Sequence, residues 1–166
     1  MKIRESYNQS GVDGYYSEQS DSYSNPHTAF VKECLDSIQI DGPRIIDFGC
    51  GDGLVTKHLM KNKSLTFVGI DKYMADRYSR ETKFQAVSLG FDEMINGIDV
   101  QADVAICSYV IDLIPDTFIK QVMWSLSQSV ERIITIRPNS HRLNCNWLHE
   151  TQHIKCGKAR LTEYTK

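Results

Sequence analysis

The sequence predicts a single α/β domain with a mostly parallel sheet. Short apolar runs alternate with segments of helical spacing, which is typical of strands joined by helical crossovers. A glycine-rich turn separates the first of these strands from the helix after it. The last part of the chain fits two strands around a turn, which predicts a C-terminal antiparallel hairpin. At 166 residues the chain is long enough for one hydrophobic core and too short for a separate recognition domain.

The first 24 residues are expected to differ from the rest of the chain. Residues 1–24 are rich in Ser, Tyr, Gly and Gln without helical or strand periodicity, which predicts an irregular arm. Residues 25–166 would then form the folded domain. Asn25 followed by Pro26 is typical of a helix start, and apolar residues at helical spacing predict a helix that runs to Ile38.

The remaining elements follow from apolar runs and the turns between them. Strands of the parallel part are predicted at 44–48, 65–70, 84–87, 103–107 and 132–136. Helices are predicted over 54–60 and 118–130. The two strands of the hairpin are predicted at 146–150 and 159–164.

Composition and charge exclude several classes of protein. With 41% hydrophobic and 24% charged residues, the chain has the composition of a soluble globular protein. A net charge of −2 argues against a generally cationic nucleic-acid binder. No secretory signal or membrane-spanning stretch is evident, so we expect a cytoplasmic protein that does not enter a membrane. Its five scattered cysteines are expected to be reduced thiols.

The C-terminal part is more basic than the rest. From Arg137 onward there are six Lys or Arg residues and three histidines against two glutamates. This segment fits either a basic face for an anionic partner or a solvated hairpin surface.

The strongest functional signal is the run Asp47-Phe48-Gly49-Cys50-Gly51-Asp52-Gly53, between a predicted strand and a predicted helix. Glycines at such a turn allow the backbone to approach a ligand closely. A dinucleotide fingerprint needs a third glycine where this chain has Leu54, which counts against NAD or FAD. The carboxylate of Asp47 would repel a diphosphate and suits a ligand that carries an ammonium group. Asp71, at the end of the next strand, is placed to accept hydrogen bonds from ribose hydroxyls.

On these residues the chain resembles the class I S-adenosylmethionine-dependent methyltransferases. Their first motif, an acidic residue followed by alternating glycines, matches Asp47, Gly49, Gly51 and Gly53, and their acidic residue after the second strand matches Asp71. The segments 102–109 and 112–116 look like their fourth strand and the loop after it. The resemblance implies a Rossmann-like three-layer sandwich and a transferase that converts S-adenosylmethionine to S-adenosylhomocysteine.

The resemblance also implies where the cofactor binds. Gly49 and Gly51 would approach its methionine part, Asp71 the ribose, and Lys72, Tyr73 and the loop 88–91 the adenine. Tyr15, Tyr16, Tyr23 and His27 would either close over the methionine end or only pack the arm. The full set of expected cofactor-binding residues is Asp47, Gly49, Cys50, Gly51, Asp71, Lys72, Phe91, Ser108 and Tyr16.

Catalysis of methyl transfer does not require an assigned base. The reaction is an in-line displacement, so alignment and desolvation supply much of the acceleration, and a base is needed only if the acceptor must lose a proton. Asp112, His27 and Tyr109 are candidates because they lie near the end of the fourth strand or before the first helix. Each has a structural alternative, such as ion pairing for Asp112.

The methyl acceptor is only partly restricted by the sequence. DNA is unexpected, because the chain resembles neither the Pro-Pro-aromatic motif of amino-methylating DNA enzymes nor the Pro-Cys motif of cytosine-C5 enzymes. A small molecule is favoured, and RNA or a protein stays open, as does the oligomeric state. A cofactor-binding module without its own activity and a nucleotide-dependent oxidoreductase are the competing hypotheses.

A zinc site near the C-terminus is not expected. Metal-ligand residue types recur at short intervals near the C-terminus, but the segment fits a hairpin and contains no Cys-x-x-Cys pair. The residues concerned are His141, Cys145, His149, His153 and Cys156.

Overall fold

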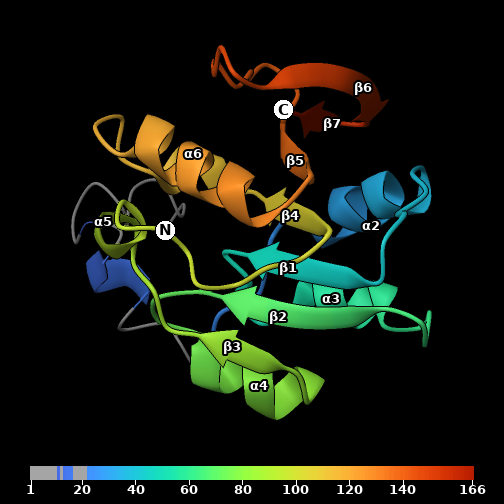
Figure 1. The fold of residues 1–166 in the computed structure, drawn as a ribbon. Coiled ribbons are helices and arrows are strands. Elements are labelled where there is room, and N and C mark those ends of the chain that lie inside the picture. Colours follow the sequence, from blue (N-terminus) through green and yellow to red (C-terminus); the bar gives the residue numbers. More distant parts are fainter. Residues whose placement is uncertain (1–10, 12, 17–21) are drawn as a thin grey trace.

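The computed structural model describes residues 11, 13–16 and 22–166. Among these residues, seven strands form one sheet in the order β3-β2-β1-β4-β5-β7-β6 (Figure 1). The strands are β1 (Arg44–Phe48), β2 (Thr66–Ile70), β3 (Gln85–Val87), β4 (Val104–Ser108), β5 (Arg132–Pro138), β6 (His149–Cys156) and β7 (Ala159–Thr165). Strands β1 to β5 pair in parallel, and β7 pairs antiparallel with both β5 and β6. The predicted fold class is therefore confirmed.

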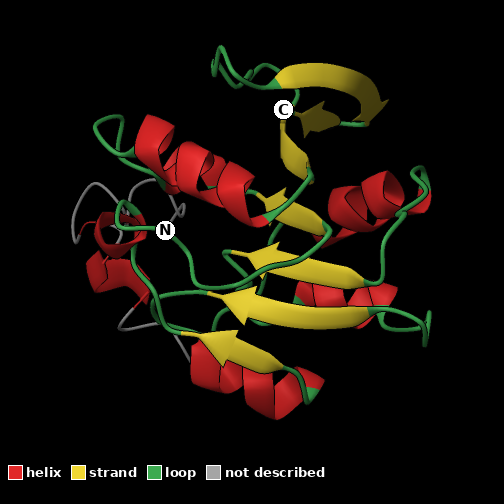
Figure 2. Ribbon diagram, in the orientation of Figure 1, coloured by secondary structure: helices red, strands yellow, loops and turns green. Residues whose placement is uncertain are grey.

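Helices cover both faces of this sheet and complete three layers (Figure 2). They are α2 (Thr28–Asp36), α3 (Leu54–Leu59), α4 (Ala75–Thr82), α5 (Phe91–Met94) and α6 (Ile119–Ser129), with a short 3₁₀ turn, η1 (Ile111–Leu113), after β4. Side chains of α5 and α6 pack into one core cluster, and those of α2 and α3 pack into the cluster on the opposite face. Two faces with a core each are what a parallel sheet requires.

The central strands are apolar because both of their faces are covered. In β1, Ile45, Ile46 and Phe48 are buried, and β1 pairs with β2 on one side and β4 on the other. Residues 104–107 of β4 are buried in the same way. Both strands were predictable as continuous apolar runs, and the predicted bounds agree with the structure to within one residue.

The hairpin is where the predicted bounds are wrong. Its first strand, β6, spans His149–Cys156 instead of 146–150, and most of its residues are exposed. Because β6 is an edge strand with little buried surface, its sequence has no hydrophobic alternation from which to read its bounds. The apolar residues before it, Cys145 and Leu148, are buried in a loop that packs against the core.

The first helix begins later than its sequence suggests. Residues 26 and 27 form a turn, and α2 starts at Thr28 with His27 in the N-cap position. Asn25 stabilises that turn, because its Oδ1 accepts a hydrogen bond from the His27 N–H (2.8 Å) and its carbonyl accepts one from the Thr28 hydroxyl.

The irregular arm predicted for residues 1–24 lies mostly outside the described residues. Where the structure describes it, residues 13–16 are helical, so the prediction of irregular structure was wrong there. Aromatic packing accounts for the difference. The ring of Tyr16 stacks on Tyr73 at 6.1 Å and contacts Tyr23 at 5.6 Å, contacts that a local propensity argument does not include.

Glycine is required at the start of α3 for two separable reasons. Gly53 has φ +84°, and a Cβ there would lie 2.6 Å from the Thr82 methyl group; Gly97 has φ +103° but open space around it. We expect Gly97→Ala to cost about 1 kcal/mol of unfolding free energy, the cost of the left-handed conformation alone. Gly53→Ala is expected to cost about 3 kcal/mol, because overpacking adds to it.

Chemical denaturation of both variants measures the difference. Adding Thr82→Ser to Gly53→Ala removes the clashing methyl group and keeps the hydroxyl that bonds to Tyr78 and Phe84. It should recover part of the loss. Equal costs for the two glycine variants would show that close packing at Gly53 contributes nothing.

Candidate cofactor site

A cavity of about 740 Å³ opens at the carboxyl ends of β1, β2, β3 and β4. Its volume is in the range of cavities that hold small ligands and cofactors. In an open α/β sheet this edge, where the strand order changes direction, is where ligands bind. The lining residues come from the glycine turn after β1, the segments after β2 and β3, the end of β4 with the loop after it, and the N-terminal segment.

The glycine turn lies under one wall of the cavity. Gly49, Gly51 and Gly53 have φ values of +66°, +52° and +84°, a conformation that residues with a side chain rarely adopt. The backbone N–H groups of Gly49 and Cys50 donate to the carbonyl of Ile70 at the end of β2 (2.8 and 3.1 Å). The turn is thus attached to the neighbouring strand.

Asp47 is the last polar group of β1 and is buried, with 2% of its surface exposed. Its Oδ2 accepts hydrogen bonds from the backbone N–H (3.2 Å) and the hydroxyl (2.8 Å) of Thr56 in α3. Burial raises the pKa of Asp47 to about 7, although the two bonds from Thr56 oppose this shift. Asp47 also contributes to the cavity wall. It therefore joins strand to helix and places a titratable carboxyl group beside the ligand space.

Asp71 connects two walls of the cavity. Its Oδ2 accepts a hydrogen bond from the Gly51 N–H (3.1 Å), and its Oδ1 accepts from the N–H groups of Tyr73 (2.9 Å) and Met74 (3.0 Å). Burial raises its pKa, against the effect of these bonds. A carboxylate has about four acceptor positions, so three bonds leave capacity for a ligand hydroxyl.

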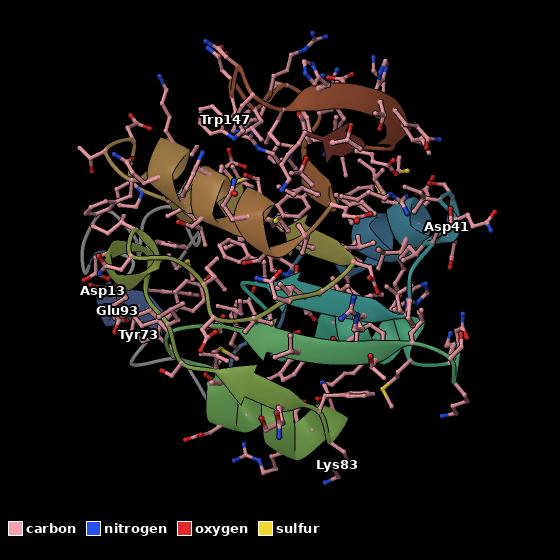
Figure 3. All side chains as sticks on the ribbon, viewed as in Figure 1. Asp13, Asp41, Tyr73, Lys83, Glu93 and Trp147 are labelled. Carbon is pink, nitrogen blue, oxygen red and sulfur yellow. The ribbon has the colours of Figure 1, made fainter. Side chains whose placement is uncertain are left out.

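The cavity end beyond Asp71 is formed by residues from three segments. Lys72, Tyr73 and Phe91, the residues expected near the adenine, line this end of the cavity. Tyr16 lines it as well and stacks on Tyr73, whereas the sequence suggested a place at the methionine end. Asp13 fixes this end, because its carboxylate accepts a hydrogen bond from the Tyr73 hydroxyl and lies 3.6 Å from the Lys72 ammonium group. Figure 3 shows Asp13 and Tyr73 side by side.

At the other end, Ser108 and Tyr109 line the cavity from the end of β4. The Ser108 hydroxyl oxygen is buried and has no hydrogen-bond partner among the described residues. Tyr109 has φ +52°, an uncommon value for a residue with a side chain, and its ring stacks on His27 at 3.8 Å. His27 is not among the described residues that line the cavity, and its contact with the site is this stack on Tyr109. Burial lowers the pKa of His27 and raises that of Tyr109.

The structure does not bring Asp112 to the cavity wall. Its carboxylate accepts hydrogen bonds from Nη2 and Nε of Arg137 (2.6 and 3.3 Å) and lies 2.8 Å from His141 Nδ1. Burial acts to raise its pKa, but the bonds from Arg137 and His141 outweigh burial and lower it. A paired, acidic carboxylate is a poor proton acceptor, which fits the ion-pairing alternative for this residue.

Several lining residues have no signal in the sequence. Asp13 lies in a polar segment with no recognisable motif, and Asn25 was expected only as a helix cap. Leu113, Pro115 and Phe118 line the cavity from the loop after β4, where apolar residues are equally typical of ordinary core packing.

Charge is distributed unevenly around the cavity. Its carboxylates come from the glycine turn and the β2 and β3 side, against a single lysine among the described lining residues. The β4 side carries no charged side chain: its lining residues are Asn25, Ser108, Tyr109, Val110, Leu113, Pro115 and Phe118. The acidic residues are Asp13, Asp47, Asp52, Asp71 and Asp92. One half of the cavity thus favours a cationic ligand, and the other an uncharged one.

The cysteines and histidines near the C-terminus do not gather. Over residues 11, 13–16 and 22–166, no group of three or more His, Cys, Asp or Glu side chains is arranged to hold a metal ion. All five cysteines are buried free thiols. In the same part of the chain, no helix combines the length and the apolar character needed to cross a membrane.

Known proteins resemble this chain at two levels. Residues 22–142 match a family model described as a methyltransferase domain. In sequence, the ribosomal protein L11 methyltransferase of Histophilus somni strain 2336 is 42% identical over 48 residues, which is 29% of this chain and 16% of that protein. The chain therefore accounts for only a small part of that relative's length.

Solved structures extend the likeness to the whole fold. The magnesium protoporphyrin IX methyltransferase of Synechocystis PCC 6803, solved with bound SAM, superimposes with a TM-score of 0.64 at 14% identity, covering 99% of this chain and 95% of that one. An rRNA methylase from Escherichia coli gives a TM-score of 0.59 at 14% identity, covering 84% and 63%. Because the family model spans most of the chain and the fold agrees over nearly all of it, the chain belongs to the methyltransferase domain family.

Proposed function

We propose that this protein transfers a methyl group from S-adenosylmethionine to a small, uncharged acceptor. The observation that carries the proposal is the cavity at the carboxyl edge of the sheet. The backbone N–H groups of its glycine turn already donate hydrogen bonds within the protein, and carboxylates line only one half of the cavity.

The glycine turn is unsuited to a diphosphate. A diphosphate site needs free backbone N–H groups at the turn and the helix start. Here the N–H groups of Gly49 and Cys50 donate to Ile70, that of Gly51 to Asp71, and that of Gly53 to the Cys50 carbonyl (2.8 Å). These bonds, with the surrounding carboxylates, favour a ligand without phosphate.

The carboxylates suit the charges of S-adenosylmethionine. Its sulfonium and ammonium groups are cationic, and Asp47 and Asp52 lie on the side of the glycine turn, where its methionine part would bind. Asp71 would accept a bond from the ribose. Tyr73, Phe91 and Tyr16 offer aromatic and apolar surface for the adenine ring.

The chemistry of the site rests on alignment and exclusion of water. When bound, the cofactor supplies an electrophilic methyl group whose bond to sulfur breaks as the acceptor's lone pair attacks. Aromatic and aliphatic side chains at the β4 end, such as Tyr109, Leu113 and Phe118, would displace water from the acceptor. The buried Ser108 hydroxyl would orient it with a hydrogen bond. His27 would hold the Tyr109 ring in place.

The acceptor class follows from the uncharged half of the cavity. A phosphate-rich RNA strand or a charged peptide segment would meet either apolar side chains or carboxylates there. A small neutral molecule with an apolar or aromatic body, and a nitrogen, oxygen or sulfur nucleophile, fits better. Such an acceptor needs a base only if its nucleophile must lose a proton when it is methylated.

Incubation with S-adenosylmethionine labelled in its methyl group and a fractionated metabolite extract tests this proposal. Label should appear in low-molecular-weight, neutral fractions. Label in added total RNA or in protein would contradict the acceptor class, and cofactor binding without transfer to any fraction would favour the binding module. Tighter binding of NAD than of S-adenosylhomocysteine, measured by calorimetry, would contradict the cofactor as well.

If Asp71 binds the ribose, replacing its carboxylate should weaken binding of S-adenosylhomocysteine. Asp71→Asn removes the charge and one acceptor, so we expect it to weaken S-adenosylhomocysteine binding by about 1 to 3 kcal/mol. Asp92→Asn is the matched control, because Asp92 lines the same cavity from α5. Isothermal titration calorimetry on folded variants measures both. An unchanged dissociation constant for Asp71→Asn would refute the ribose role.

From the raised pKa of Asp47 we expect two opposite effects of pH. As the pH rises, the free energy of unfolding should fall and the affinity for the cofactor should increase. The pKa of Asp47 is about 7 in the folded protein, whereas its ordinary value is 3.8. The protonated carboxyl group therefore stabilises the fold at low pH, and this contribution is lost as the pH rises through about 7. An ammonium-bearing ligand favours the ionised form. Below pH 7, affinity for S-adenosylhomocysteine should therefore fall by up to about tenfold per pH unit.

Asp47→Asn should remove both effects, since its amide oxygen can still accept from Thr56. At pH 8 we expect a Tm at least about 2 °C higher than that of the native chain, with weaker binding of S-adenosylhomocysteine that no longer depends on Asp47 ionisation. Asp52→Asn, in the same turn, should retain the pH dependence. Calorimetry between about pH 6 and pH 8 compares them. A pH dependence that survives in Asp47→Asn would assign the proton to another group.

A further inference from the structure

The basic C-terminal part of the chain separates its charges between the two faces of the sheet. Arg137 of β5 pairs with Arg160 of β7, and Arg160 pairs with Lys155 of β6. Directly opposed residues of antiparallel strands point to the same face, so these three cations form a row across three strands. We call Arg137, Arg160 and Lys155 the basic row.

Carboxylates compensate this row only at one end. Glu163 alternates with Arg160 along β7 and therefore points to the other face, where it pairs with Arg132 (2.6 Å). On the face of the row, Asp112 pairs with Arg137, and Glu150 lies 3.0 Å from His153 of β6. Within the described residues, Arg160 and Lys155 form no ion pair. The row thus carries about two uncompensated positive charges.

Two of its members also keep unused hydrogen-bond donors. Arg137 is nearly buried, with 9% of its side chain exposed, and its Nη1 has no acceptor. The Nε of Arg160 is buried without an acceptor as well. Like charges directly opposite each other destabilise a sheet, and buried donors without partners add to that cost. An oxyanion bound beside Arg160 and Lys155 would offset the repulsion between the cations.

We propose that the basic row binds a phosphate monoester, with Arg160 and Lys155 as direct ligands and Arg137 beneath them. A phosphate monoester carries about −1.5 to −2 charges at pH 7, which matches the two uncompensated cations. Guanidinium and ammonium donors are the groups that bind such oxygens most strongly. A carboxylate or a phosphodiester, with one charge, would balance only half of the row.

The row is connected to the cavity through one ion pair. Arg137 is bonded to Asp112 of η1, and the next residue of η1, Leu113, lines the β4 side of the cavity. A phosphate at the row would change the field on this pair. The proposal does not depend on methyl transfer, because it rests on the charges of β5, β6 and β7 alone.

Thermal denaturation in sodium phosphate, with sodium chloride at matched ionic strength as reference, tests the row. We expect phosphate at several times its dissociation constant to raise the Tm of the native chain by about 3 °C. Arg160→Gln and the exposed Lys155→Gln should each lose at least half of this rise. Lys63→Gln, which removes an exposed cation elsewhere, should keep it. No rise, or an equal rise in Lys155→Gln, would overturn the proposal.

Three further ligands, measured by calorimetry, identify the chemistry. Ribose 5-phosphate should bind with an affinity similar to that of inorganic phosphate, and acetate should bind at least about tenfold more weakly. A short single-stranded RNA without terminal phosphates should show no binding that Lys155→Gln weakens. If RNA binds more tightly than phosphate and Lys155→Gln releases it, the monoester assignment is wrong and the row is a phosphodiester site.

Discussion

The candidate site depends on the bonds that the Asp71 carboxylate accepts from the backbone around it. One oxygen binds the N–H of Gly51 in the turn after β1, and the other binds two N–H groups in the turn after β2. These bonds connect two adjacent loops at the carboxyl edge of the sheet. Because Gly51 adopts a positive φ there, the connection requires both the carboxylate and the absence of a side chain.

This arrangement uses the turn differently from a phosphate-binding loop. In a phosphate-binding loop the backbone N–H groups point to the ligand, which supplies the negative charge. In this protein a side-chain carboxylate and main-chain carbonyls satisfy those donors, so the negative charge belongs to the protein. A strand, a glycine turn and a helix can therefore form cavities of opposite electrostatic character, and the hydrogen bonds within the turn determine which one results.

Charge is separated along the whole sheet edge. Carboxylates gather on the β1 to β3 side of the cavity, uncharged side chains line the β4 side, and the basic row begins at Arg137 of β5. The pair between Asp112 and Arg137 lies where the last two regions meet. Asp47 shows what such an arrangement costs. Burial raises the pKa of its carboxyl group to about 7, so the protein is less stable when that group is ionised.

The sequence by itself determined the parallel part of the fold and the position of the glycine turn. Buried strands such as 104–107 contain nothing but apolar or small residues, and the glycines of the turn tolerate a backbone that other residues avoid. Both signals are local. A strand such as β6 has no such signal, because an exposed edge strand buries too little surface to constrain its composition.

Tertiary structure alone decided which side chains share a wall. Asp13 and Lys72 are far apart in the chain and meet through packing of the Tyr16 and Tyr73 rings. Asp112 contacts Arg137 and does not line the cavity, and this depends on the course of the loop after β4 relative to β5. The alignment of Arg137 with Arg160 depended on the strand register. Which side chains come into contact is set by the free energy of packing between distant segments. Residue types and their spacing along the chain are therefore not enough to predict these contacts.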